Sequence, residues 1–263
     1  MLAAEEAAIG WWGLVGSLAL VAVAIGLSLW GRLGLERSMA WASVRAVVQL
    51  LAVGAVLTYL LADDRSILLA VGWVVVMVLV AALTVRARAS EVPAVFGLAL
   101  ASIGASAAIG LALLFVLGIF PLEGKTVVPL AGMLVGNAMA ATIVASRRIL
   151  GELTDKRDEV EARLALGLGW PDASRPYVRA ALRTALTPQI ESTKAVGLVA
   201  LPGAMTGLIL AGVAPIDAVK VQAAVMFMIL GGVATAVTVL SLGLTRRLFT
   251  ADHRLRPLAR PAT

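Results

Sequence analysis

The stretch VVPLAGMLVGNAMAATIVASR, residues 127–147, decides the fold class, because 20 residues pass before its first charged side chain, Arg147. An α-helix rises about 1.5 Å per residue, so about 20 apolar residues cross the roughly 30 Å hydrocarbon core of a bilayer. The pattern therefore predicts an all-α, polytopic integral membrane helical bundle of about seven transmembrane helices, with residues 1–263 in a single transmembrane domain. The six further apolar runs of similar length lie at residues 9–30, 42–61, 67–85, 92–119, 195–212 and 219–244.

The composition of the whole chain supports this class. Hydrophobic residues make up 60% of it and charged residues 14%, against about 25% charged residues in a typical soluble domain. The chain contains no cysteine, which excludes disulfides, thiolate metal sites and cysteine nucleophiles. The one histidine, His253, lies in the C-terminal tail. We therefore predict no metal site and no resident cofactor in this chain.

Lysine and arginine residues are distributed unequally between the predicted connections. With the N-terminus outside the cell, 19 of the 22 lie on the cytoplasmic side, nine of them in residues 147–194 and five in a basic tail, residues 245–263. The outer side keeps Arg65, Lys125 and Lys220. This split predicts a multi-pass protein of the cell (inner) membrane, with its N-terminus out and its C-terminus in. Attraction to anionic lipid headgroups accounts for the net charge of +6, so no nucleic-acid partner is needed to explain it.

The one long connection is a cytoplasmic loop at residues 151–194. Its first half, ELTDKRDEVEARLAL (residues 152–166), carries two acidic-to-basic pairs four residues apart, which favour a solvated helix. Gly167 and Gly169 are expected to stop this helix, and Pro171 to enforce the break.

A second helix is expected in the same loop. Asp172 or Ser174 caps its start, and it ends before Pro188. Two interpretations of its basic face remain open: arginines beside lipid headgroups, or a docking element for a soluble partner. The arginines that recur every four residues on that face are Arg175, Arg179 and Arg183.

Polar side chains inside the predicted spans are candidates for a transport pathway. Arg45 and Gln49 lie four residues apart on the second span, where Arg45 either faces the pathway or extends to the membrane surface. Asn137 lies near the middle of the fifth span, where an amide must hydrogen-bond to another helix or face a cavity. Gln222 and Thr206 are similar candidates.

A proline interrupts the sixth predicted span. Pro202 and Gly203 predict a kink, because proline lacks a backbone donor and clashes with the preceding turn. Broken helices are common along transport pathways, although a merely packed kink is the alternative. The thioethers of Met139 and Met205 are available to a soft ion, while ordinary packing is the other interpretation.

The heptapeptide EARLALG, residues 161–167, resembles the EAA loop of ABC-transporter permeases. In that loop, Glu-Ala-Ala and a glycine at this offset form the coupling helix that inserts into the ATP-binding subunit. The residues that we assign to coupling on this basis are Glu161, Ala162, Leu166, Gly167, Arg175 and Arg179.

Four more segments share in the resemblance. Together with the heptapeptide they are similar to the FetB/YbbM-type family of ABC permeases, which includes a bacterial iron exporter subunit and plant aluminium-tolerance proteins. The family pattern in the sixth span runs Leu-Pro-Gly-Met-Met-Thr-Gly-Gln. This chain has Ala204 in place of the first Met of that pattern and Leu208 in place of the Gln, so the resemblance does not decide the identity of the substrate. The segments are RAVVQLL (45–51), GMLVGNAMAA (132–141), VGLVALPGAMTGLILAG (196–212) and AVKVQAAVMFMIL (218–230).

The resemblance implies the membrane subunit of an ABC transporter that exports iron or another metal, working as a homodimer. Two separate ATP-binding subunits would carry ATP and Mg²⁺, and their closure would push on residues 161–167 and tilt the fifth and sixth helices. The chain is then not itself an enzyme. Its GIFPLEGKT (118–126) has Gly118 six residues before Gly124, where a phosphate-binding loop requires five. The alternative is a secondary transporter or channel that works without an ATPase.

Overall fold

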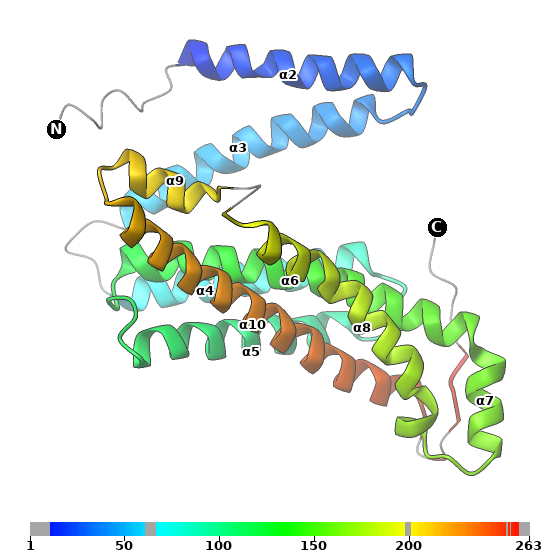
Figure 1. The fold of residues 1–263 in the computed structure, drawn as a ribbon. Helices are drawn as coiled ribbons and strands as arrows, with labels where there is room; N and C mark the ends of the chain where they lie inside the picture. The colour runs from blue at the N-terminus through cyan, green and yellow to red at the C-terminus, as the bar shows by residue number, and fades with distance from the viewer. Residues whose placement is uncertain (1–10, 61–66, 198–200, 251, 253, 258–263) are drawn as a thin grey trace.

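The computed structural model describes residues 11–60, 67–197, 201–250, 252 and 254–257. These residues form α-helices joined by short connections, and Phe249 and Leu255 pair as an isolated antiparallel bridge near the C-terminus (Figure 1). The helices are α2 (Trp11–Trp30), α3 (Glu36–Leu60), α4 (Ile67–Arg88), α5 (Val95–Val116), α6 (Gly124–Asp155), α7 (Arg157–Ala165), α8 (Trp170–Ala195), α9 (Gly203–Leu210) and α10 (Pro215–Leu248).

Five of these helices, α3, α4, α5, α6 and α10, are long and apolar enough to cross a membrane, and α2 contributes a shorter apolar helix, Val15–Trp30. The chain is thus a multi-pass helical membrane protein, as predicted. Residues 198–200 of the sixth predicted span, residues 195–212, lie outside the described residues, and the described part differs from the prediction. Its described helix, α9, has eight residues, and Pro202 precedes it in an extended conformation, with φ −64° and ψ 144°. Eight residues rise about 12 Å, so α9 is too short to cross a bilayer by itself.

The core of the molecule is formed by α4, α5, α6 and α10, with α8 packed along α6 and α10. Leu134 of α6 is fully buried and lies between a glycine of α5, Gly110, and a glycine of α10, Gly232. A methyl group built on either glycine would overlap the Leu134 side chain. Small residues at these two positions therefore allow the three backbones to approach closely, as in many membrane bundles.

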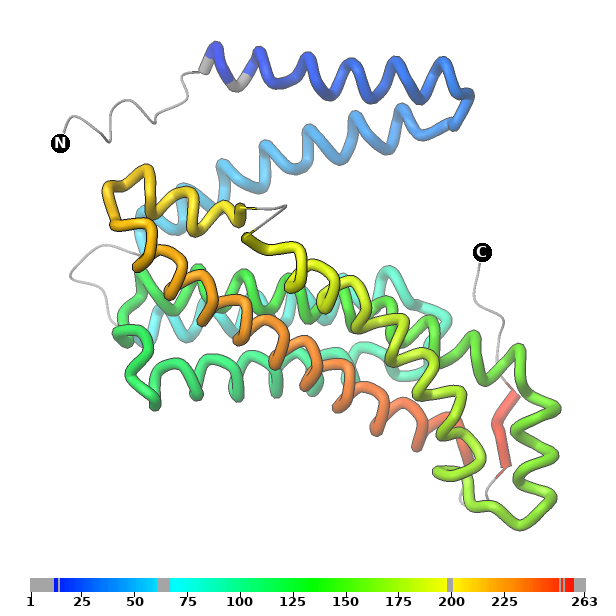
Figure 2. Tube along the Cα trace, viewed as in Figure 1, coloured from blue at the N-terminus to red at the C-terminus, as the bar shows by residue number. Residues whose placement is uncertain are grey.

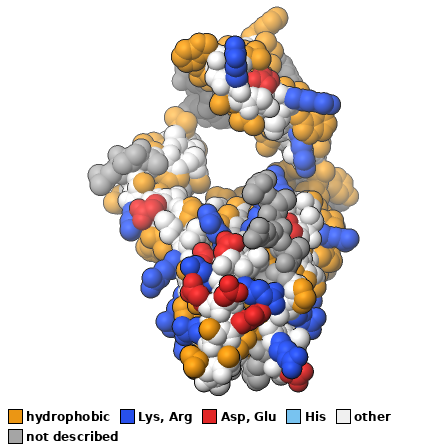
Figure 3. Space-filling model, turned by 90° about the vertical axis from the view of Figure 1, so that its right-hand side faces the viewer, with side chains coloured by type: hydrophobic (Ala, Val, Ile, Leu, Met, Phe, Trp, Pro, Cys, Tyr) orange, Lys and Arg blue, Asp and Glu red, His pale blue; other side chains and the backbone are white. Residues whose placement is uncertain are grey.

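Helices α2 and α3 form a hairpin that stands apart from this core (Figure 1). A hydrogen bond from Ser28 Oγ to Glu36 Oε1, 2.8 Å long, closes the turn between them. The most apolar 18-residue stretch of α3 has no residue buried inside the molecule. Leu57, near the C-terminal end of α3, packs against a small cluster that contains Ala70 and Val127. Figure 3 shows the open hollow between the hairpin and the rest of the molecule.

The two ends of the bundle differ in charge. The α2–α3 and α4–α5 connections, the turn between α7 and α8, and the chain after α10 all lie at one end, on the right of Figure 2. We call this the basic end, because it holds Arg32 of the α2–α3 connection, Arg86 and Arg88 in the last turn of α4, and Arg246 and Arg247 in the last turn of α10. An ion pair between Arg147 Nε and Glu91 Oε1, 2.9 Å long, joins α6 to the α4–α5 connection at this end. Lys125 and Lys220 belong to the opposite end.

The predicted cytoplasmic loop, residues 151–194, is almost entirely helical, and its helix boundaries differ from the prediction. The fifth span does not stop at Arg147, because α6 continues to Asp155. The chain then breaks at Lys156, whose φ of −104° and ψ of 25° are not helical, and α7 begins. The predicted pairs, Glu152 with Lys156 and Glu159 with Arg163, are replaced by an Arg157–Glu161 pair and a Lys156–Glu159 pair.

The start and end predicted for the second helix are wrong. α8 begins at Trp170, before Asp172, because Pro171 lies in its first turn, where no backbone donor is required. Ser174 is inside the helix and donates its hydroxyl to Trp170 O at 2.7 Å instead of capping. The helix also continues through Pro188 to Ala195. Packing of its buried alanines against α6 and α10 outweighs the local cost of the proline.

Candidate coupling site and transport pathway

A sharp turn connects α7 to α8 at the basic end. Gly167 adopts a φ of +88°, in the left-handed region that glycine enters without strain. The Gly167 N–H donates to Leu164 O at 3.0 Å, and the Leu168 N–H donates to Arg163 O at 3.3 Å. This pair of bonds is the Schellman motif, which satisfies the last carbonyls of a helix. The predicted role of Gly167 as a helix stop is confirmed.

The α7–α8 turn, which we define as residues 166–169, exposes apolar side chains. Leu166 is 83% exposed and Leu168 is 39% exposed. Alanine or glycine directly flanks both leucines in the chain, and the turn that carries them lies at the basic end (Figure 1). These two leucine side chains are therefore accessible for contact with another protein.

The turn is supported by packing and hydrogen bonds between α7 and α8. Val160 is fully buried against the core. The Lys156 ammonium donates to Glu159 Oε1 at 2.9 Å, and the Tyr177 hydroxyl donates to Glu159 Oε2 at 3.0 Å. These hydrogen bonds, first that from Lys156 and then that from Tyr177, hold the pKa of the Glu159 carboxyl below its ordinary value. The hydrogen bond from Tyr177 thus connects α8 to α7, whereas the bond from Lys156 lies within the α7 segment.

The structure places the six predicted coupling residues at the basic end, all exposed. Glu161 forms an ion pair with Arg157, with 2.7 Å between Oε1 and Nε. The next residue, Ala162, is also exposed. Arg175 lies 3.6 Å from Asp172, on the exposed side of α8. Figure 3 looks onto this end and shows charged side chains of both signs gathered over it. The other members of the set are Leu166, Gly167 and Arg179.

The predicted pathway residues are not gathered into one site. Arg45 and Gln49 are exposed on α3, in the hairpin that stands apart from the core. Asn137 is exposed on α6, and its amide donates to Met133 O within the same helix at 2.7 Å. Met139 is half-buried and packs against the core, which agrees with its ordinary packing interpretation.

The predicted pathway residues of the sixth span lie at and in α9, which packs on α10. Pro202 precedes the helix, and the Thr206 hydroxyl donates back to Pro202 O at 3.2 Å. α9 itself is largely exposed. It contains three of the predicted pathway residues, Gly203, Met205 and Thr206. It also contains Ala204 and Leu208, the two positions at which the chain departs from the family pattern.

Gln222 of α10 is the predicted pathway residue that the structure places inside the bundle. Its side chain is 4% exposed, and its Oε1 has no hydrogen-bond partner among the described residues. A buried amide oxygen normally has a partner, so an unpaired one is unusual. Gln222 therefore has an acceptor atom available to a water molecule or to cargo.

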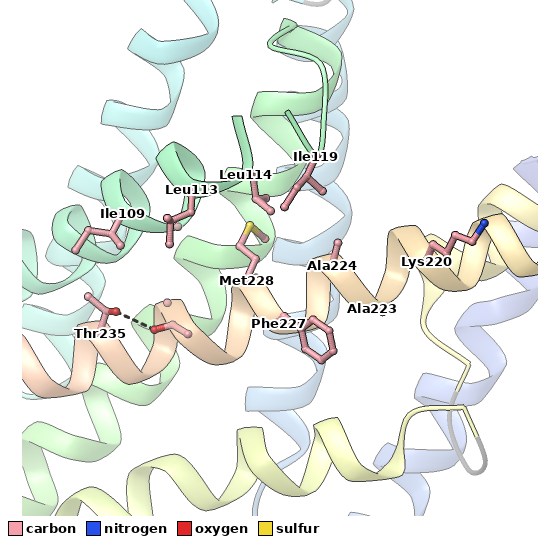
Figure 4. Close-up of a pocket in the computed structure, with 13 residues that line it drawn as sticks. Ile109, Leu113, Leu114, Ile119, Lys220, Ala223, Ala224, Phe227, Met228 and Thr235 are labelled. Carbon is pink, nitrogen blue, oxygen red and sulfur yellow. Dashed lines mark hydrogen bonds between the residues drawn. The ribbon is translucent and has the colours of Figure 1, made fainter. Parts of the chain in front are cut away.

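The cavity in Figure 4 lies between α5 and α10 and has a volume of about 580 Å³. Its walls are apolar, with Met228 pointing toward Leu114 across the gap. Of its polar groups, Lys220 lies at one end and the Thr235 hydroxyl donates to Gly231 O at 2.8 Å. None of the nine predicted pathway residues lines it. Within the described parts of the chain, no group of three or more His, Asp or Glu side chains lies close enough together to hold a metal ion.

Sequence reasoning missed three residues that shape the basic end. Trp170 begins α8 and stacks on Phe249, with ring centroids 5.8 Å apart. Arg157 contacts backbone carbonyls of the tail, about 98 residues away in the chain. The available signals in the sequence were a tryptophan beside glycines, Trp170, and two apolar residues in a basic tail, Phe249 and Leu255. Neither signal indicates which residue the side chain will contact.

Comparisons with known proteins agree with a membrane protein of this length. The family model described as "Uncharacterised protein family (UPF0014)" matches residues 11–249. The "Probable iron export permease protein FetB" of Escherichia coli (strain K12) is 36% identical over 241 residues, which cover 91% of this chain and 92% of the relative.

Two plant proteins are also similar. The "UPF0014 membrane protein STAR2" of Oryza sativa subsp. japonica is 41% identical over 82% of this chain and 76% of its own length. The "Protein ALUMINUM SENSITIVE 3" of Arabidopsis thaliana is 37% identical over 82% of this chain and 78% of its own length. No solved structure matches significantly. With a match across nearly its whole length and relatives this similar, the chain belongs to the UPF0014 family of membrane proteins.

Proposed function

We propose that the chain is the membrane-spanning permease subunit of an ABC transporter that exports iron or another metal. A separate ATP-binding subunit, which carries ATP and Mg²⁺, docks on the α7–α8 turn. The observation that carries this proposal is the exposed Leu166 at the end of a rigid helical turn. A soluble partner covers this side chain in the assembled complex, which removes apolar surface from water.

The relatives support the class of function and the cargo. The Escherichia coli relative, aligned over nine-tenths of both chains, is named a probable iron export permease. Iron is accordingly the first cargo to test. Another metal is the second, because Ala204 and Leu208 in α9 differ from the residues of the family pattern. The enzymatic step, ATP hydrolysis, belongs to the partner subunit.

The basic end is the cytoplasmic end in this proposal. Its excess of Lys and Arg follows the positive-inside rule, and it presents the α7–α8 turn to a soluble partner. Closure of the ATP-binding subunits would push on this turn. Because α6 runs unbroken from the opposite end of the bundle to Asp155, a push at the basic end would be carried into the membrane as a helix tilt.

We further propose that two copies of the chain form a homodimer through the α2–α3 hairpin. Apolar side chains are exposed around α3, including Val48 at 60% and Leu51 at 54%, and the hollow in Figure 3 separates this helix from its own bundle. A second copy would cover the apolar faces of α3, and a closed twofold pair would then accept two ATP-binding subunits.

A pull-down in mild detergent tests the docking proposal. The wild type is compared with Leu166→Glu, and the matched control is Leu117→Glu. Leu117 is 66% exposed and caps α5 before Gly118 in the same kind of turn, but at the opposite end of the bundle. We expect an ATP-binding subunit to be retained by the wild type and by Leu117→Glu, and to be lost with Leu166→Glu.

Transport is measured on the same complexes in inside-out vesicles, with Fe²⁺ as the probe. ATP-dependent uptake by the wild type, absent in Leu166→Glu, is the expected result. If folded wild-type protein retains no ATPase and moves metal without ATP, the chain is a secondary transporter or channel and the docking proposal is wrong.

A further inference from the structure

The chain folds back after α10 ends at Leu248. The Thr250 N–H donates to Arg254 O at 2.9 Å, and the backbones of Phe249 and Leu255 pair as an isolated antiparallel bridge. Phe249 and Leu255 are 3% and 5% exposed, so this short segment is packed against the protein. We call the described residues of this segment the C-terminal clasp: Phe249, Thr250, Arg254, Leu255 and Arg256.

The first contact of the C-terminal clasp is with the start of α8. The rings of Phe249 and Trp170 are stacked, with centroids 5.8 Å apart and planes inclined by 23°. Stacked aromatic rings attract each other beyond the effect of the apolar area that they bury. Since Trp170 directly follows the α7–α8 turn, this stack attaches the end of α10 to that turn.

The second contact is with the start of α7. Arg157 donates from Nη1 to Arg256 O and from Nη2 to Leu255 O, each at 3.3 Å. Its remaining donor edge, Nε, is paired with Glu161 Oε1 at 2.7 Å. The planar guanidinium thus joins a carboxylate of α7 to two backbone carbonyls of the clasp, a geometry that the ammonium of lysine cannot reproduce.

These two contacts connect the exposed turn to the longest helix of the bundle. α10 has 34 residues, which corresponds to a length of about 51 Å, and it packs against α5, α6, α8 and α9. It also carries Gln222, the buried amide with an unpaired acceptor. A displacement of the α7–α8 turn therefore has a direct mechanical route to α10 through the C-terminal clasp.

We propose that the C-terminal clasp transmits movement of the α7–α8 turn to α10, with Glu161 as a positioning residue that orients Arg157 toward the clasp. The inference rests on the proposed function. It assigns Glu161, the first residue of the coupling motif, a partner within its own chain instead of on the ATP-binding subunit. The Arg157 and Glu161 side chains are 38% and 49% exposed, and exposed ion pairs contribute little to the stability of the fold. Loss of this pair should therefore change transmission and leave the fold intact.

A spin-label distance measurement tests the clasp independently of the cargo. The chain has no cysteine, so Val116→Cys at the end of α5 and Ile216→Cys at the start of α10 give two unique labelling sites. Both side chains are exposed, 83% and 65%. In the complex with the ATP-binding subunit, trapping with Mg-ATP and vanadate is expected to change the distance between the two labels.

The test variants are Arg157→Gln, which removes the donors to the clasp, and Phe249→Leu, which removes the aromatic stack but keeps an apolar side chain. We expect both to retain the ATP-binding subunit and to lose the vanadate-induced distance change. Arg256→Gln is the matched control, because it removes a neighbouring exposed arginine while its backbone carbonyl still accepts from Arg157. It should behave like the wild type.

The two proposals fail in different ways. A distance change of wild-type size in both Arg157→Gln and Phe249→Leu would overturn the clasp and leave the ABC permease proposal intact. Failure of the folded wild type to hold an ATP-binding subunit would overturn both proposals. Loss of the subunit from Arg157→Gln would also overturn the clasp, because Arg157 would then act in docking.

Discussion

Gly167 is the residue on which the shape of the α7–α8 turn depends. Its φ of +88° is strained for any residue with a Cβ, although no other atom lies within 4 Å of the position a Cβ would take. Its role is therefore conformational and not steric.

Gly167→Ala is expected to destabilise the protein by about 1–2 kcal/mol, the cost of a left-handed conformation for an L-residue with a side chain. Gly72→Ala is the matched control, because Gly72 lies within α4 with open space around it and no positive φ. It should be neutral or slightly stabilising, because alanine is the better helix former. Thermal unfolding in detergent measures both, and equal midpoints for the two variants would contradict the assigned strain.

Leu134 is the residue that sets the spacing of α5, α6 and α10. It is 0% exposed and wedged between Gly110 and Gly232, so it cannot move away from one glycine without pressing on the other.

Gly232→Ala is expected to lower the free energy of unfolding by about 1–3 kcal/mol, the usual range for overpacking a close-packed core. The added methyl group would overlap Leu134 and lie 2.9 Å from Ser106 Oγ. The control is the preceding residue in the same helix, Gly231→Ala, which meets no atom within 4 Å. Denaturation of the two variants in the same detergent separates steric overlap from helix propensity; a stable Gly232→Ala would show that Leu134 repacks freely.

Helix α7 is attached to α8 through a titratable side chain, Glu159. The pKa of Glu159 is held below its ordinary value of 4.5 by hydrogen bonds from Lys156 and Tyr177. A depressed carboxyl pKa stabilises the folded state above the unfolded pKa, and this stabilisation is lost as the pH falls through the folded value.

Hydrogen exchange of α7, corrected for the intrinsic pH dependence of exchange, should therefore be steady above pH 4.5 and accelerate below it. Tyr177→Phe removes one of the two hydrogen bonds to Glu159 and should weaken this pH dependence. The core part of α10 in the same sample is the internal control. An α7 whose protection does not respond to acid would contradict the assigned role of Glu159.

Helix boundaries illustrate what local signals decide and where packing overrides them. The stop at Gly167 was predictable, because a positive φ is a property of one residue. The start of α8 at Trp170 and its passage through Pro188 were not, because the buried face at Ala181 and Ala185 packs on α6 and α10. The split of the predicted sixth span at Pro202 was expected as a kink, but the short length of α9 was not.

The proposed homodimer is a property of the whole molecule and can be tested by crosslinking. Single cysteines introduced along α3, such as Val48→Cys and Leu51→Cys, should crosslink two copies in membranes with helical periodicity, because one face of α3 meets the partner. Leu242→Cys is the control, since this side chain is 68% exposed on α10, outside the proposed interface. Crosslinking at Leu242 but not along α3 would place the dimer contact elsewhere.

The sequence by itself determined the properties that depend on composition and short spacing. The apolar runs and the glycine stop of the EARLALG segment are features of short stretches of sequence. The runs reflect the transfer of residues from water to lipid, and the stop reflects the backbone of one turn. Family membership followed from the same segments and is confirmed by the match across residues 11–249.

Only the tertiary structure decided which distant residues meet. It separated the α2–α3 hairpin from the bundle, placed Leu134 between two glycines of other helices, and joined Arg157 to carbonyls 98 and 99 residues further along the chain. Such contacts depend on how whole helices pack. No local sequence pattern specifies the partners, because a backbone carbonyl or a buried leucine has the same local chemistry whichever distant residue the fold places beside it.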